Sequence, residues 1–180
     1  MKTSVLRLAI AVAFVTPAAA QARGVTYNCD TAANHYSELT FPTGDSFRAS
    51  GKVRLLNIVK SKKYATIARL VVTNDQEVPG PSDEAWAGFT FLNLADLDEP
   101  VPGLLLGTRR EKGQEADEEN FGIASGTEVT FELSYDGEEV NLQVDGHSTT
   151  IPFIAHTPAL RIVCSTGEFL IHDLVIEEQP

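Results

Sequence analysis

Hydrophobic and polar residues alternate with a period of two over long stretches of the chain. The clearest case is 128–145, where an alternating run ending at Tyr135 is followed by Asp136-Gly137 and by a second alternating run ending at Val144. Successive side chains of a β-strand point to opposite faces, and Asp-Gly favours a tight turn, so this pattern predicts a β-hairpin with one buried face. The residues expected in the core are Val129, Phe131, Leu133, Val140, Leu142 and Val144.

Further runs of the same character cover 52–60, 64–73, 86–93, 104–109, 160–164 and 169–177. Pro and Gly fall mainly between these runs, as turn residues do in antiparallel sheets, and no window of a dozen residues carries a helical stripe. We expect the first two runs, which only 61–63 separate, to form a second hairpin. The sequence therefore predicts an all-β fold, a two-sheet antiparallel sandwich of roughly ten to twelve strands, in a single domain over 21–180.

The first twenty residues have the features of a secretory signal peptide. Lys2 and Arg7 flank the start of an apolar run over 8–15, and a stretch of small residues, 18–20, follows it. This run is too short to span a bilayer and no later run approaches the necessary length, so we expect no membrane insertion. The alternative is a buried N-terminal helix in a cytosolic protein. The signal interpretation predicts removal of 1–20 and a secreted or periplasmic protein.

Export to an oxidising compartment favours a disulfide between the two cysteines, Cys29 and Cys164. Such a bridge would join the N-terminal strand to a strand near the C-terminus. Neither cysteine belongs to a CxxC pair or lies in a histidine cluster, so the pattern does not indicate a metal site.

The net charge of the chain excludes one class of partner. The formal charge is −11, and it becomes −13 when Lys2 and Arg7 leave with the signal peptide. Such acidity argues against binding nucleic acid or an anionic membrane through phosphate contacts. An early basic cluster is interpreted as a solvated strand surface, with an anion-binding face as the alternative. It comprises Arg48, Lys52, Arg54, Lys60, Lys62, Lys63 and Arg69.

The 129–146 hairpin, together with the strand 169–176, resembles the late strands of the concanavalin A-like lectin and glucanase superfamily, which includes laminin G-like modules. The resemblance implies a jelly-roll sandwich whose last strand pairs near the N-terminus. It covers about a quarter of the chain and concerns the fold, on which many functions occur.

Retaining glucanases of this superfamily carry a Glu-x-Asp-x-Glu strand, and Glu115, Asp117 and Glu119 match that pattern. Two such carboxylates act as nucleophile and acid/base about 5–5.5 Å apart. Here Glu118 occupies a position that is apolar in the enzymes, and glycines bracket the segment, so we interpret 115–119 as a solvated loop without catalytic function. The sequence contains no GxSxG, HExxH or glycine-rich phosphate-loop motif. His172 and Asp173 are adjacent in a strand pattern, and we expect their side chains to point to opposite faces.

The leading hypothesis is an exported, non-catalytic module that binds carbohydrate or another cell-envelope ligand. Trp86 is the candidate aromatic platform for a sugar ring, with a core position as the alternative; alternation places it opposite Phe89 and Phe91. No cofactor is required, although Asp96, Asp98 and Glu99 offer oxygen ligands of the kind calcium prefers. The alternative functions are a glycan-cleaving hydrolase of the same fold and an accessory structural subunit that packs against an envelope protein.

Overall fold

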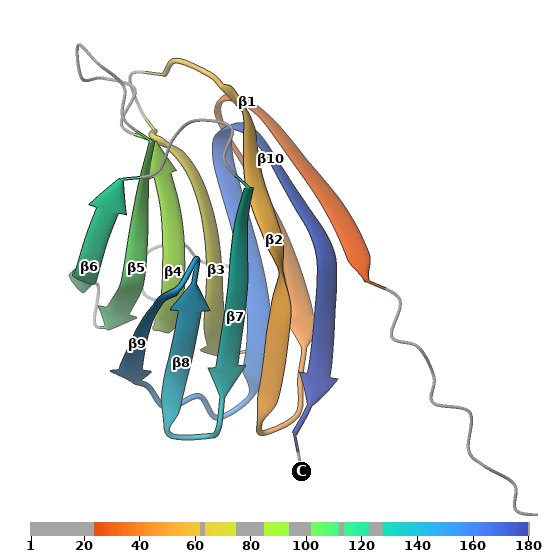
Figure 1. The fold of residues 1–180 in the computed structure, drawn as a ribbon, viewed down its shortest axis with the longest axis vertical. Coiled ribbons are helices and arrows are strands. Elements are labelled where there is room, and N and C mark those ends of the chain that lie inside the picture. Colours follow the sequence, from red (N-terminus) through yellow and green to blue (C-terminus); the bar gives the residue numbers. More distant parts are fainter. Residues whose placement is uncertain are drawn as a thin grey trace, which may run out of the picture.

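The computed structural model describes residues 24–61, 64–74, 85–93, 102–111, 114–122 and 128–179. These residues form ten antiparallel strands (Figure 1). The strands are β1 (Val25–Pro42), β2 (Phe47–Ile58), β3 (Thr66–Asn74), β4 (Trp86–Asn93), β5 (Pro102–Glu111), β6 (Gln114–Gly122), β7 (Glu128–Tyr135), β8 (Glu139–Val144), β9 (His147–Pro152) and β10 (Pro158–Glu178). The predicted signal peptide, 1–20, lies outside the described residues, and no helix within them could cross a membrane.

Hydrogen bonds link the strands in the order β6-β5-β4-β3-β10-β2-β7-β8-β9, and β1 pairs with β10. The two ends of this path face each other across the core, where β4 and β5 approach β8 and β9 (Figure 1). We call the first layer sheet I: β6, β5, β4, β3, and the parts of β10 and β1 over 158–165 and 36–42. Sheet II contains β2, β7, β8, β9, and the parts of β10 and β1 over 167–178 and 25–31. The predicted all-β sandwich is confirmed.

The long strand β10 passes from sheet I to sheet II at Gly167. Before this point β10 pairs with β3, and from Gly167 onward the same edge pairs with β2. A Cβ at Gly167 would lie 2.5 Å from Cγ2 of Thr66 on β3 and 2.9 Å from the carbonyl oxygen of Asn57 on β2. Only glycine therefore allows both strands to approach β10 here. Thr166, with φ of 53°, supplies the local bend.

The hairpin predicted over 128–145 is present as β7 and β8, and the six residues expected in its core are each at most 2 % exposed. Its turn is closed by Asp136, whose Oδ1 accepts hydrogen bonds from the backbone N–H groups of Glu138 and Glu139 at 3.0 and 2.9 Å. Ring pairs join the two sheets: Phe89 of β4 lies 5.4 Å from Phe131 of β7, between ring centroids.

The predicted disulfide is confirmed. Cys29 of β1 and Cys164 of β10 are bonded and buried, with a Cα–Cα distance of 6.3 Å. Cys29 belongs to the part of β1 in sheet II, and Cys164 belongs to the part of β10 in sheet I. The bond therefore ties the two sheets together close to the bend of β10.

The second predicted hairpin is wrong, although both of its strands exist. β2 pairs with β10 and β7, whereas β3 pairs with β10 and β4. The two strands meet consecutive segments of β10, so the chain crosses from sheet II to sheet I between them. β2 and β3 therefore lie in different sheets and do not form a hairpin. The runs 160–164 and 169–177 likewise form one continuous strand, β10.

Candidate functional site

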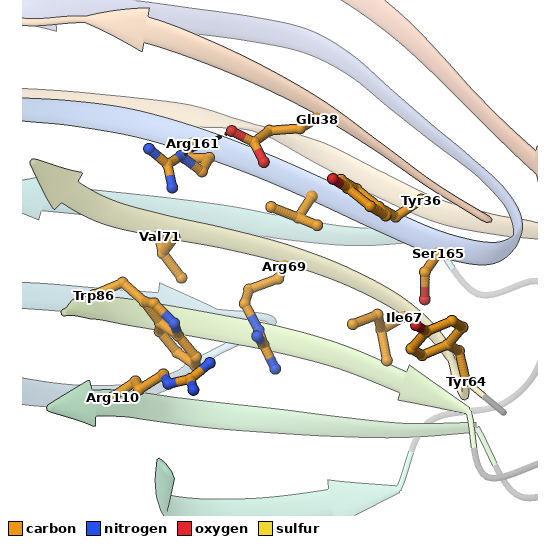
Figure 2. Close-up of a pocket in the computed structure, with 11 residues that line it drawn as sticks. Tyr36, Glu38, Tyr64, Ile67, Arg69, Val71, Trp86, Arg110, Arg161 and Ser165 are labelled. Atoms are coloured by element: carbon orange, nitrogen blue, oxygen red, sulfur yellow. Dashed lines mark ion pairs between the residues drawn. The ribbon is translucent and has the colours of Figure 1, made fainter. Parts of the chain in front are cut away.

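A pocket of about 300 Å³ lies on the outer face of sheet I (Figure 2). Its described lining comes from β1, β3, β4, β5 and β10, and from the segment before β3. The lining residues are Tyr36, Glu38, Tyr64, Ile67, Arg69, Val71, Trp86, Arg110, Arg161, Val163 and Ser165. This volume is at the lower end of the range for small-molecule sites, about 300–1,000 Å³.

The strand period places these residues on one face. On β3, Ala68, Leu70 and Val72 enter the core, so Ile67 and Arg69 between them point outward. The same alternation on β10 buries Leu160, Ile162 and Cys164 in the core and turns the residues between them toward the pocket. The core pattern of two adjacent strands therefore determines the pocket wall.

Aromatic side chains lie toward both ends of the pocket. Tyr36 and Tyr64 are 62 % and 45 % exposed, and they lie near Ser165 at one end (Figure 2). Trp86, at the other end, is only 6 % exposed. The two tyrosines therefore offer ring surface to a ligand, whereas Trp86 forms part of the wall.

Arginines surround Trp86. The Cζ atom of Arg69 lies 4.2 Å from the centroid of the Trp86 ring, and its Nε donates a hydrogen bond of 3.0 Å to Oγ1 of Thr90. Arg110 of β5 is the register partner of Trp86 on β4, and its side chain lies beside the Trp86 ring (Figure 2). The cation–π contact and the hydrogen bond together hold the Arg69 guanidinium in one orientation.

A third arginine, Arg161, is 7 % exposed. Its Nε lies 3.3 Å from Oε1 of Glu38, and this ion pair connects β10 to β1. Removing charge from water costs free energy that an opposite charge partly offsets, so Glu38 stabilises Arg161 at this position.

Among the residues of the pocket, the sequence singled out Trp86 as a binding candidate. The structure confirms that Trp86 lies on the face opposite Phe89 and Phe91, which are in the core. Tyr36, Arg110 and Arg161 were not identified. The sequence could have indicated Arg161, because a single arginine within the apolar strand 159–164 must point away from the core.

The segment with Glu115, Asp117 and Glu119 was expected to be a solvated loop, and the expected loop conformation is wrong. These residues belong to β6, the edge strand of sheet I, where Glu115 is the register partner of Arg110. Pairing with β5 gives the segment a strand conformation despite its polar sequence. The absence of a catalytic function stays a prediction.

His172 and Asp173 form a pair after all. His172 Nδ1 lies 3.2 Å from Oδ2 of Asp173, and Nε2 lies 2.8 Å from Oε2 of Glu128. Strict alternation fails here because Asp173, with φ of 54°, lies in an irregularity of the β10–β2 pairing. The hydrogen bond with His172 lowers the pKa of Glu128, and Lys52 acts in the same direction. This cluster is on sheet II, remote from the pocket on sheet I.

The early basic cluster is not one continuous face. Arg48 and Lys52 of β2 form ion pairs with Glu132 and Glu128 of β7, as expected for a solvated strand surface. Arg69 instead lines the pocket on sheet I.

Asp96, Asp98 and Glu99, the calcium candidates, lie outside the described residues. Within the part of the chain that the structure describes, no three His, Cys, Asp or Glu side chains are grouped suitably for a metal ion.

No protein-family model matches the chain, and no curated protein matches its sequence. The fold is similar to that of the carbohydrate-binding module CBM66 from Bacillus subtilis, with 10% identity, a TM-score of 0.53 and coverage of 86% of this chain and 95% of that one. A family 7 alginate lyase gives 13% identity, a TM-score of 0.54 and coverage of 87% and 78%.

A β-glucanase from Bacillus licheniformis gives 10% identity, a TM-score of 0.52 and coverage of 86% and 78%. At these identities the similarity shows the fold alone. The chain has the jelly-roll fold of the concanavalin A-like lectins and glucanases, as the resemblance of its late strands implied.

Proposed function

We propose that this chain is an exported, non-catalytic carbohydrate-binding module that holds its ligand in the pocket on the outer face of sheet I. The observation that carries the proposal is the pair of exposed rings, Tyr36 and Tyr64, beside fixed polar groups in one concavity. A sugar ring can pack its apolar face on an aromatic ring while its hydroxyl groups form hydrogen bonds. Arg69, Arg161 and Glu38 supply such hydrogen-bonding groups.

The fold comparisons support a glycan ligand, because one of the similar structures is a carbohydrate-binding module. Export is supported by the signal-like residues 1–20 and by the disulfide between Cys29 and Cys164, a bond typical of oxidising compartments.

The non-catalytic role is supported by the composition of the pocket. Canonical glycoside hydrolysis uses two carboxyl groups on either side of the scissile bond. Among the described lining residues, Glu38 is the single carboxylate, and it forms an ion pair with Arg161. The described lining therefore supplies one of the two carboxyl groups that this mechanism uses.

Glycan cleavage is the second candidate function. It is favoured by one observation: Glu115, Asp117 and Glu119 lie on a strand of the same sheet as the pocket. The similarity to a β-glucanase fits this candidate as well. The two candidate functions can be distinguished by the products, because a binding module releases its saccharide unchanged and a hydrolase releases shorter saccharides.

The proposal is tested by isothermal titration calorimetry of the purified protein with oligosaccharides selected on a glycan array, with and without calcium. We expect Tyr36→Ala to weaken binding about tenfold, or about 1.4 kcal/mol, because a ring contact is lost. The matched control is Ile154→Ala, since Ile154 is 68 % exposed and does not line the pocket. Equal affinity of the wild type and Tyr36→Ala would show that the saccharide does not bind in this pocket.

A further inference from the structure

We propose that the saccharide bound in this pocket carries acetamido groups, and that one such group is held at the tyrosine end of the pocket. This inference rests on the proposed function and goes further, since it specifies the chemical class of the ligand. The observations that carry it are two aliphatic side chains on the outer face of sheet I and two hydroxyl groups of complementary capacity beside them.

The floor of the pocket at this end is aliphatic. Ile67 and Val163 line the pocket and are half-buried, although they lie on the outer face of sheet I. The face of an antiparallel sheet that points away from the core usually carries polar residues. A methyl group of a ligand that packs on these two side chains is removed from water, which stabilises the complex.

The strand register places a hydroxyl group next to this floor. Ser165 of β10 lies between Tyr36 of β1 and Ile67 of β3 in one cross-strand row. Val163 precedes Ser165 by two residues and therefore points to the same face. Neighbouring strands are about 4.8 Å apart, so one small group of a ligand can contact all four side chains.

The two hydroxyl groups have complementary hydrogen-bonding capacity. Ser165 is 7 % exposed, and its Oγ donates a hydrogen bond of 2.9 Å to the carbonyl oxygen of Ala65. With its proton used in this way, Oγ can only accept a hydrogen bond from a ligand. Tyr36 is exposed, and none of the described residues forms a hydrogen bond with its hydroxyl group. The Tyr36 hydroxyl is therefore available as a donor.

An acetamido group matches each of these features. It has a methyl group, an N–H donor and a carbonyl acceptor, and its trans amide directs the N–H and the C=O in opposite directions. Figure 2 shows the hydroxyl end of Tyr36 directed toward Glu38, away from Ser165. The N–H can thus donate to Ser165 while the carbonyl oxygen accepts from Tyr36. The methyl group then packs on Ile67 and Val163, a contact that a sugar hydroxyl group in the same place cannot provide.

The test compares saccharides that differ only at C2, by isothermal titration calorimetry. One pair is tetra-N-acetylchitotetraose and cellotetraose, and the other is the methyl glycosides of N-acetylgalactosamine and galactose. O-acetylated xylotetraose and xylotetraose form a third arm. Burial of a methyl group raises affinity about fourfold, and one additional hydrogen bond raises it about fivefold. We therefore expect at least one acetamido saccharide to bind ten times or more tightly than its hydroxyl counterpart.

Variants locate the recognition of the acetamido group. Val163→Thr replaces a methyl group with a hydroxyl group and should weaken binding of the acetamido saccharide about fourfold. Tyr36→Phe keeps the ring and removes the donor, and it should weaken the same binding about fivefold. Neither change should affect the hydroxyl counterpart. Val25→Thr is the matched control, since Val25 is 40 % exposed and does not line the pocket.

The outcomes separate the two proposals. Equal or tighter binding of the hydroxyl counterparts would overturn the acetamido ligand and leave carbohydrate binding intact. Preference for O-acetylated xylotetraose over every acetamido saccharide would overturn the hydrogen bond from the N–H to Ser165. Absence of binding to every saccharide would overturn both proposals. The wild-type comparison needs no variant, so the inference stays testable even where Val163→Thr does not fold.

Discussion

Removing the disulfide should strongly destabilise the fold, and the size of the effect follows from the chain separation. The change we consider is the double variant Cys29→Ala, Cys164→Ala. Alanine is preferred to serine because both sulfur atoms lie in the apolar core, where a hydroxyl group would need a hydrogen-bond partner.

The bond closes a loop of 135 positions. The chain-entropy model gives about 17 cal/mol/K for such a loop, or about 5 kcal/mol at 25 °C. Small domains have unfolding free energies of about 5–15 kcal/mol, so this loss is at least a third of the total. For a domain of this size it corresponds to a fall in Tm of about 10–20 °C.

The assay is urea unfolding followed by circular dichroism, for wild type with and without reductant and for the double variant. We expect the reduced wild type and the variant to unfold at similar, much lower urea concentrations than the oxidised protein. An unchanged midpoint on reduction would refute the reasoning that the bond restrains the unfolded chain. Two reactive thiols in the denatured, unreduced protein would show that the bond is absent.

Three other predictions concern single sites. Phe131→Asp should abolish cooperative unfolding, because Phe131 is 1 % exposed and the new charge would have no partner in the core. Two backbone N–H groups donate hydrogen bonds to the Asp136 carboxylate and lower its pKa in the folded protein. The ionised carboxylate therefore contributes stability above its unfolded pKa of about 4, and this contribution is lost as the pH falls through the lower pKa of the folded protein. The urea midpoint of Asp136→Ala should therefore approach that of wild type at low pH, and a constant difference would contradict this cause. Glu115→Gln and Glu119→Gln should leave the free energy of unfolding nearly unchanged. A reducing-sugar assay of the wild-type protein should detect no β-glucan hydrolysis. If the wild type does hydrolyse β-glucan and either variant loses this activity, the chain is an enzyme.

The sequence predicted those parts of the fold in which local pattern and burial agree. In the β7–β8 hairpin the alternating residues and the Asp-Gly turn indicate the same pairing, and both are observed. The bridge from Cys29 to Cys164 was predicted from the expected oxidising compartment and the cysteine count.

Long-range pairing could not be predicted in the same way. β2 and β3 are neighbours in sequence, but each pairs with a different part of β10, more than eighty residues later. No local signal indicates this partner. The strand β6 was missed for a related reason, because its polar residues adopt strand geometry through pairing with β5.

The candidate site was predicted only in part. Trp86 was singled out by residue type, whereas Arg69, Arg110 and Arg161 come from three strands that only the fold brings together. Their outward direction follows from alternation, but their common location requires the strand order of sheet I.

The central claim is that a saccharide binds in the pocket of sheet I, and the fluorescence of Trp86 tests it most directly. Trp86 is the single tryptophan of the chain and lines the pocket, so its emission reports on this site. We predict a saturable change in emission on titration with the bound saccharide, with the same midpoint as calorimetry. Calorimetric binding with an unchanged Trp86 emission would contradict the account and place the ligand elsewhere on the protein.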